Sequence, residues 1–135
     1  MTKYFAAYAA TAVVMVALDL VWLGLIAKPL YQHGIGHLMA ERPDIPVALV
    51  FYAVYALGLM VFAVTPEQSS AGWSSALVVG ALFGLFAYAT YDLANLATLK
   101  NWPWRISLLD LVWGTLVSGV SSAAGRLALD RFGAG

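Results

Sequence analysis

Four long runs of apolar residues divide the chain, and short polar stretches separate them. The runs cover Tyr4–Ala27, Ile45–Val64, Trp73–Leu99 and Ile106–Leu129. Each reaches the roughly 20 residues that a helix needs to cross the hydrocarbon of a bilayer. Because the bilayer core offers no water to the backbone, such segments are expected to be helices. The pattern predicts an all-α polytopic membrane protein, with one domain of four transmembrane helices in an antiparallel bundle.

Four spans place both termini on one face, called here the terminal face, and the loop Lys28–Asp44 on the opposite face, called the loop face. The loop Pro66–Gly72 on the terminal face is short and polar, whereas Lys28–Asp44 contains Tyr31 and both histidines. Lysine and arginine divide three against four between the faces, so the positive-inside rule does not decide the orientation. Lys3 in the short N-terminus leads us to expect cytoplasmic termini.

Composition agrees with a membrane protein and narrows its chemistry. Hydrophobic residues make up 62% and charged residues 10% of the chain, whereas a soluble domain is about 25% charged. The formal net charge is zero and no basic block occurs, so nucleic-acid binding is not expected. The absence of cysteine excludes disulfides, thiol nucleophiles and cysteine metal sites.

Three of the seven acidic residues, Asp19, Asp92 and Asp110, lie inside the apolar runs. An aspartate near the bilayer centre costs about 2.5–3.5 kcal/mol on insertion scales, and such residues usually face the bundle interior. The helical rise of 1.5 Å per residue places all three within roughly 12 Å of the loop face. Two of them belong to the repeated string LDLVW, at Leu18–Trp22 and Leu109–Trp113. These copies run in opposite directions, so they converge on one layer.

Polar and aromatic residues at helical spacing accompany these acids. Tyr88, Asp92 and Asn95 form one stripe, and each repeated tryptophan lies three residues after its aspartate, on the same helix face. We therefore predict a cup-shaped acidic pocket that opens toward the loop face. The predicted ligand-binding residues are Asp19, Trp22, Tyr52, Tyr55, Tyr88, Asp92, Asn95, Asp110 and Trp113.

Small residues at i, i+4 spacing occupy the half of the third and fourth spans nearer the terminal face. They are Ala76, Gly80 and Gly84 in the third span and Gly114, Ser118 and Ser122 in the fourth. Such residues allow helices to approach closely in membranes. Tight packing is expected there, and a homo-oligomer through these faces is a further possibility.

Several of these residues also have structural interpretations. The acids could accept hydrogen bonds from Tyr52, tryptophan indoles or Asn95, or pair with Lys28, Lys100 or Arg105. Trp22 and Trp113 are interpreted first as interface anchors, and we expect the same of Trp102 and Trp104. His33 and His37 have the i, i+4 spacing of a metal pair, but Gly34 and Gly36 argue against a rigid helix. A lid that titrates near neutral pH suits these histidines better.

The string YATYDLANLATLKNWPW at Tyr88–Trp104, followed by LLDLVWG at Leu108–Gly114, resembles the bacterial inner-membrane proteins grouped as domain of unknown function 2177. The resemblance extends over nearly the whole chain, including DLVWLG in the first span. Ala94 departs from it, because threonine is more usual there, so a hydroxyl at this position is not expected to be essential. The resemblance implies a four-span protein of the inner membrane and no known activity.

Three functions remain open. The first is binding or transport of a small cationic or amphipathic ligand, taken from the loop face or the adjoining leaflet. The second is an intramembrane enzyme acting on a lipid or isoprenoid, with Asp92 or Asp110 as the catalytic acid or base. The third is a structural or assembly subunit that works through its small-residue faces. No motif identifies a cofactor, and membrane lipids are the expected surroundings.

Overall fold

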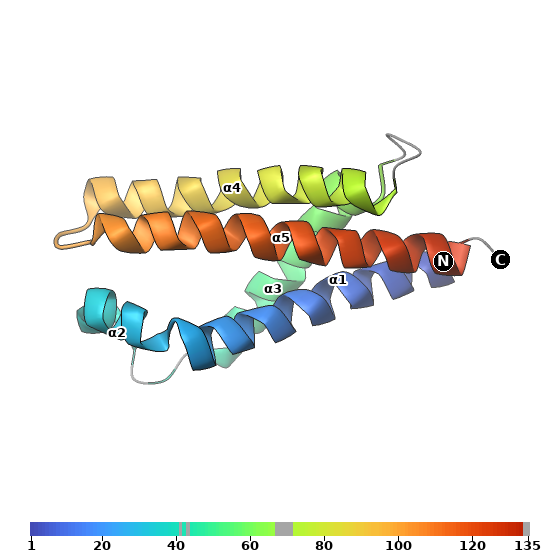
Figure 1. Cartoon of the computed structure of the whole chain (residues 1–135). Coiled ribbons are helices and arrows are strands. Elements are labelled where there is room, and N and C mark those ends of the chain that lie inside the picture. The colour runs from blue at the N-terminus through green and yellow to red at the C-terminus, as the bar shows by residue number, and fades with distance from the viewer. Residues whose placement is uncertain (41, 43, 67–71, 134–135) are drawn as a thin grey trace.

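The computed structural model is built from helices (Figure 1), and it describes residues 1–40, 42, 44–66 and 72–133. Within these residues no strand occurs, which confirms the predicted all-α class. The elements in chain order are α1 (Thr2–Val21), the π-helical turn η1 (Trp22–Ile26), α2 (Lys28–Ile35), the 3₁₀ turn η2 (Gly36–Leu38), α3 (Ile45–Leu59), the π-helical turn η3 (Met60–Val64), α4 (Trp73–Thr98) and α5 (Trp104–Gly133).

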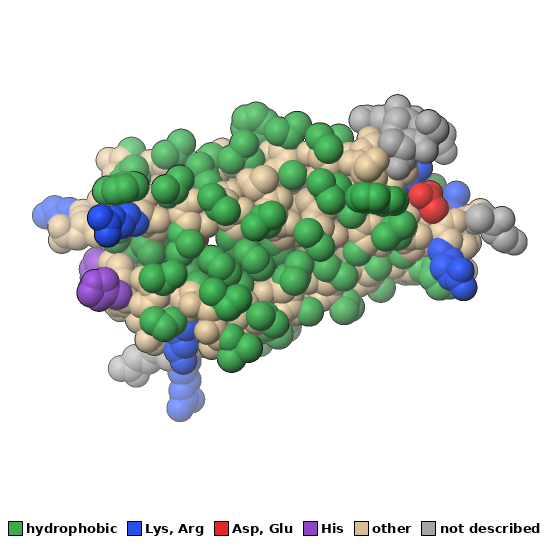
Figure 2. Space-filling model, in the orientation of Figure 1, with side chains coloured by type: hydrophobic (Ala, Val, Ile, Leu, Met, Phe, Trp, Pro, Cys, Tyr) green, Lys and Arg blue, Asp and Glu red, His purple; other side chains and the backbone are tan. Residues whose placement is uncertain are grey.

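Four helical segments are long and apolar enough to cross a membrane. They are Thr2–Ile26, Ile45–Val64, Trp73–Thr98 and Trp104–Gly133, each where the apolar pattern predicts a helix. The last is longer than predicted at both ends. On the face drawn in Figure 2, apolar side chains cover most of the length of the molecule. Lysine and arginine lie toward both ends, and histidine lies at one end. The N- and C-termini lie at the same end (Figure 1).

The closest helix pair is α4 with α5, which lie side by side along their lengths (Figure 1). A Cβ atom added to Gly84 would overlap the carbonyl oxygen of Gly114 and the side chain of Ser118. One added to Gly80 would overlap the side chain of Ser122. The two predicted small-residue stripes therefore face each other within one chain. A homo-oligomer through these faces stays a prediction.

Helix α3 departs from a regular antiparallel bundle. It crosses behind α1 and α5 instead of running along α4 (Figure 1). Its hairpin partner α4 is contacted mainly by the turn η3, at the end of the molecule where both termini lie. The N-terminal half of α3 therefore diverges from α4 toward the loop face.

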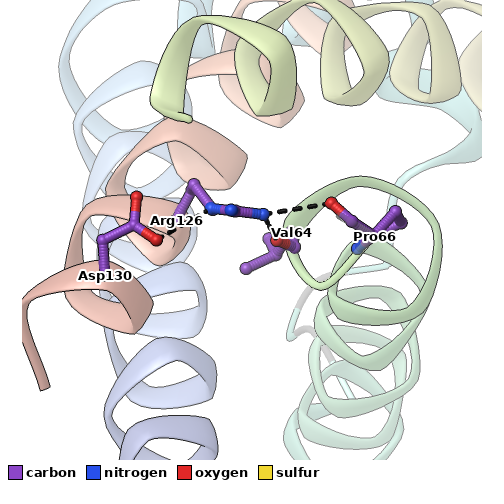
Figure 3. A network of polar contacts seen from close by, with 4 residues as sticks. All are labelled: Val64, Pro66, Arg126 and Asp130. Carbon is purple, nitrogen blue, oxygen red and sulfur yellow. Dashed lines mark hydrogen bonds and ion pairs between the residues drawn. The ribbon is translucent and has the colours of Figure 1, made fainter. Parts of the chain in front are cut away.

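A single arginine holds the end of η3 against α5 (Figure 3). The Nη1 atom of Arg126 donates hydrogen bonds to the carbonyl oxygens of Val64 at 3.2 Å and Pro66 at 3.0 Å. Its Nε atom pairs with Asp130 at 3.1 Å. The last carbonyls of a helix have no partner inside it, and a cation there is favourable. Arg126 thus satisfies the end of the second span while tying it to the fourth.

The predicted loop Lys28–Asp44 is largely helical, which corrects the sequence-based expectation. Ala27 N donates to Trp22 O at 2.7 Å, closing a wide i→i+5 turn in η1. Pro29 falls in the first turn of α2, where its missing N–H costs nothing. Of the predicted connections, Glu41, Pro43 and residues 67–71 lie outside the described residues.

Candidate functional site

The three aspartates of the apolar runs come together from three helices. Asp19 lies on α1, Asp92 on α4 and Asp110 on α5, and Asp110 interacts electrostatically with both of the others. Asp19 is 6% exposed and Asp92 is fully buried, whereas Asp110 is half-buried. The depth predicted from the number of residues along each helix therefore agrees with the structure, in which the three acids lie at one level of the bundle.

Asp19 is held by two side-chain donors from different helices. The hydroxyl of Tyr52 on α3 donates to its Oδ2 atom at 2.9 Å, and the indole Nε1 of Trp113 on α5 donates to its Oδ1 atom at 2.7 Å. A buried carboxylate needs such donors, because its water shell has been removed. Both oxygens of Asp19 are therefore satisfied.

Asp110 accepts a hydrogen bond from the hydroxyl of Tyr31, a residue of α2. Trp22 Nε1 in turn donates to the Tyr31 hydroxyl oxygen at 3.3 Å. Burial raises the pKa of the Tyr31 phenol above its usual value, and the bond to Asp110 raises it further. Tyr31 therefore keeps its proton and remains a donor to Asp110.

The tryptophan of each LDLVW string connects to the aspartate of the other string, and not to the aspartate of its own string as expected. Each had been predicted to lie beside the aspartate three residues before it. Instead Trp113 bonds to Asp19, and Trp22 reaches Asp110 through Tyr31. The two indoles stack on each other with centroids 4.5 Å apart and planes 5° from parallel. Because the helices are antiparallel, the two strings meet. The tryptophan of each string then connects, directly or through Tyr31, to the aspartate of the other.

These contacts also correct the expectation that the tryptophans are mainly interface anchors. Trp22 and Trp113 are half-buried and turned inward, and Trp102 is 8% exposed. Trp102 Nε1 donates to Ser107 Oγ at 3.1 Å, which bonds to the backbone oxygen of Asp92 at 3.2 Å. Trp104 is exposed, as an anchor would be. A buried indole needs an acceptor, and the site supplies one for each inward ring.

A cavity of about 210 Å³ lies among these groups. Its walls are Asp19, Trp22, Leu23, Tyr31, Ile35, Tyr88, Tyr91, Trp102, Asp110 and Trp113. Five of the nine predicted site residues thus line it. Tyr52 contacts it through Asp19, while Tyr55 bonds to Ser118 Oγ at 2.6 Å and borders a neighbouring cavity. Asp92 and Asn95 are not among its walls.

Five residues of the cavity wall are not among those predicted from the sequence, namely Leu23, Tyr31, Ile35, Tyr91 and Trp102. Tyr31 was assigned to a loop, and Trp102 to the membrane interface. In the structure both belong to one buried cluster with Ala27 and Ile106, and both line the cavity. The available signal was two aromatic residues within polar connections, Tyr31 in KPLYQ and Trp102 in NWPW.

Asp92 has a setting unlike that of the other two acids. Neither carboxyl oxygen has a hydrogen-bond donor among the described residues. Two carboxylates can only accept, so Asp92 and Asp110 form a hydrogen bond with each other only when one of them carries a proton. This pair can therefore hold a proton, and of its two members only Asp110 lines the cavity.

No described cation neutralises the acidic cluster. Lys28, Lys100 and Arg105 are exposed, and none of them forms an ion pair with the three aspartates. His33 and His37 are exposed on α2 and η2 and do not line the cavity. Over the residues that the structure places, no cluster of three or more histidine or acidic side chains could hold a metal ion.

Comparison with known proteins gives a family and no activity. The family model described as "Predicted membrane protein (DUF2177)" matches residues 4–127. No curated protein and no solved structure matches the chain. The match includes all three aspartates and every residue that lines the cavity. The chain therefore belongs to the DUF2177 family of predicted membrane proteins.

Proposed function

We propose that this protein binds, and in binding transports, a small cationic or amphipathic ligand in the acidic cavity. The observation that carries the proposal is that Asp19 and Asp110 line a cavity in which no described lysine, arginine or histidine faces them as an ion-pair partner. A cation in the cavity would supply that missing countercharge.

The energetics favour a ligand over a purely structural role. Polar contacts between membrane helices average about 0.6 kcal/mol, whereas placing an aspartate near the bilayer centre costs about 2.5–3.5 kcal/mol. Hydrogen bonds from Tyr52, Trp113 and Tyr31 offset part of this cost for Asp19 and Asp110. An insertion cost that contacts within the fold do not offset is expected for a residue that binds a ligand.

The aromatic walls suit the same ligand. Trp22 and Trp113, which stack on each other, both line the cavity beside the two carboxylates. Cations are attracted to the faces of aromatic rings as well as to carboxylates. An ammonium group with an attached apolar part would satisfy both kinds of wall.

The second candidate is an intramembrane enzyme that uses carboxylate acid–base chemistry on a lipid or isoprenoid. The contact between Asp92 and Asp110 favours it, because two neighbouring carboxyl groups can divide the roles of acid and base. Against it, Asp92 is fully buried and does not line the cavity. Binding is therefore our first proposal, and conversion of a lipid extract that Asp92→Asn abolishes would favour the enzyme.

The binding proposal is tested in lipid nanodiscs by equilibrium dialysis, with empty nanodiscs to subtract uptake by lipid. The probes are n-octylammonium and the neutral n-octanol. Both Asp19→Asn and Asp110→Asn remove the charge. Asp110→Asn keeps an acceptor oxygen for the Tyr31 hydroxyl, whereas Asp19→Asn keeps an acceptor oxygen for only one of its two donors. We expect each to weaken octylammonium binding at least tenfold, which corresponds to about 1.4 kcal/mol, and to leave octanol unaffected.

Asp44→Asn is the matched control. Asp44 is exposed on the loop face and caps α3 by accepting from Val47 N at 3.2 Å, and asparagine caps equally well. This variant loses one carboxylate near the loop face without touching the cavity, so octylammonium binding should not change. Equal binding by the native protein and both cavity variants would overturn the proposal. Flux of the bound cation in reconstituted vesicles then separates transport from binding alone.

A further inference from the structure

A second cavity adjoins the acidic one on the side of the molecule. It measures about 420 Å³ and lies between α3 and α4, lined by Phe51, Tyr55, Ala87, Tyr88 and Tyr91. Tyr88 and Tyr91 line both cavities. These two side chains therefore form a wall that the two cavities share.

This lateral cavity exists because α3 diverges from α4. The two helices approach each other through η3, at the end of the molecule that holds the termini, and α3 then crosses behind α1 and α5 (Figure 1). Toward the loop face the space between them is bordered by aromatic rings. Phe51 stacks on Tyr55 with centroids 6.0 Å apart, and Tyr55 meets Tyr88 edge-on at 6.2 Å.

The mouth of this cavity faces outward, at the level where apolar side chains cover the molecule. Phe51 is 48% exposed and Tyr91 is 60% exposed. Both lie on helices long and apolar enough to cross a membrane, so the surroundings of the mouth are hydrocarbon. The lateral cavity thus opens toward lipid, and only the side chains of Tyr88 and Tyr91 lie between it and the acidic cavity.

We infer that this opening is a lateral portal, and that the ligand of the acidic cavity is a single-chain amphiphile with a cationic head. The head occupies the cavity beside Asp19 and Asp110, and the alkyl chain extends between Phe51 and Ala87 into the bilayer. This inference rests on the proposed binding function and narrows its substrate class.

The position of the alkyl chain distinguishes a closed cavity from one with a lateral portal. An alkyl chain gains little by leaving lipid for an apolar groove, because the two surroundings are similarly apolar. A closed cavity would instead force the chain out of hydrocarbon whenever the head reached the carboxylates. A lateral portal removes that penalty, so the head can bind while the chain stays in apolar surroundings.

The test blocks the portal without altering the acids. Ala87 is half-buried and lines the lateral cavity but not the acidic one, so Ala87→Phe should fill the passage. Ala97→Phe is the matched control, since Ala97 is exposed on the same helix and lines neither cavity. Binding of n-octylammonium and n-propylammonium is measured in nanodiscs by equilibrium dialysis.

We expect Ala87→Phe to weaken octylammonium binding at least tenfold and to leave propylammonium binding unchanged, because the short probe needs no portal. Retained propylammonium binding also shows that the variant is folded. Ala97→Phe should bind both probes as the native protein does. If octylammonium binding survives Ala87→Phe but still depends on Asp19 and Asp110, the portal is wrong and the acidic site stands. If neither probe depends on the two aspartates, the proposed function itself fails.

Discussion

The two donors on Asp19 give a quantitative test of how the acidic cluster is held. Tyr52→Phe removes the hydroxyl that lies 2.9 Å from Asp19, and Trp113→Phe removes the indole N–H that lies 2.7 Å from it. Either change leaves the other donor in place. Polar contacts between membrane helices are worth about 0.6 kcal/mol on average and at most about 1.7, so each single variant should lose about 0.5–1.5 kcal/mol of unfolding free energy.

The double variant should lose more than the sum of the two single losses. Asp19 is 6% exposed, and without Tyr52 and Trp113 its carboxylate would have no hydrogen-bond donor among the described side chains. Leaving a buried polar group unsatisfied costs about 1–3 kcal/mol, and more for a charged one. We therefore expect an excess loss of at least about 1 kcal/mol.

A third substitution separates this explanation from simple loss of packing. Adding Asp19→Leu to the double variant removes the stranded charge, and replacing all partners by apolar groups of similar shape is nearly neutral. The triple variant should recover most of the excess loss. The measurement is reversible unfolding in mixed micelles with increasing dodecyl sulfate, followed by helical circular dichroism. Strict additivity of the single losses, or a triple variant no more stable than the double, would refute the reasoning.

Two further predictions concern the packing around the site. Gly84→Ala should lower the unfolding free energy by about 1–3 kcal/mol through overpacking against Gly114. The control Gly24→Ala should be neutral or stabilising, because a Cβ atom added there meets no atom within 4 Å. Equal effects of the two changes in the same unfolding assay would contradict the α4–α5 contact. Arg126→Met should lower the unfolding free energy by about 1–3 kcal/mol, because two carbonyl oxygens lose a charged donor. Asp130→Asn should lower it by less than about 1 kcal/mol, because the ion pair is exposed on the Asp130 side. The order of these last two losses is the test, and a reversed order would contradict the role assigned to Arg126.

The family match and the structure agree on the part of the prediction that depends on local pattern. Four helices lie where four apolar runs were read, and the fourth is longer because Trp104 and Arg105 join its first turn and Arg131 its last. Depth along each helix was also predictable, since the rise per residue is constant. Asp19, Asp92 and Asp110 were therefore expected at one level, and they meet there.

The pairing of side chains was not predictable in the same way. Spacing of i, i+3 placed each tryptophan beside the aspartate of its own string. The structure pairs Trp113 with Asp19 and links Trp22 to Asp110 through Tyr31. Which donor meets which acid depends on how far each helix is rotated about its axis and on how close its neighbour lies. Neither quantity appears in the pattern of a single helix.

The connections show the same limit. Lys28 and Pro29 were interpreted as the end of the first span, yet the π-helical turn η1 redirects the chain and α2 continues as a helix. That turn brings Tyr31 against Asp110 and Trp102. A short polar segment carries too little local preference to specify this, and burial against α5 decides it.

By itself, the sequence determined that this chain is a membrane protein of four helices and that three acids gather at one level near one end. Chain length, hydropathy and helical rise are local properties, and they suffice for those conclusions. The tertiary structure alone decided that the two LDLVW strings complete each other across the bundle, that α2 contributes Tyr31 and Ile35 to the wall of the cavity, and that α3 diverges from α4 to leave a lateral cavity. These features follow from the close approach of α4 and α5 at their glycines, from the wide turn at Trp22 and from the tie at Arg126. The first and the last of these are contacts between segments distant in the chain, which no local pattern encodes.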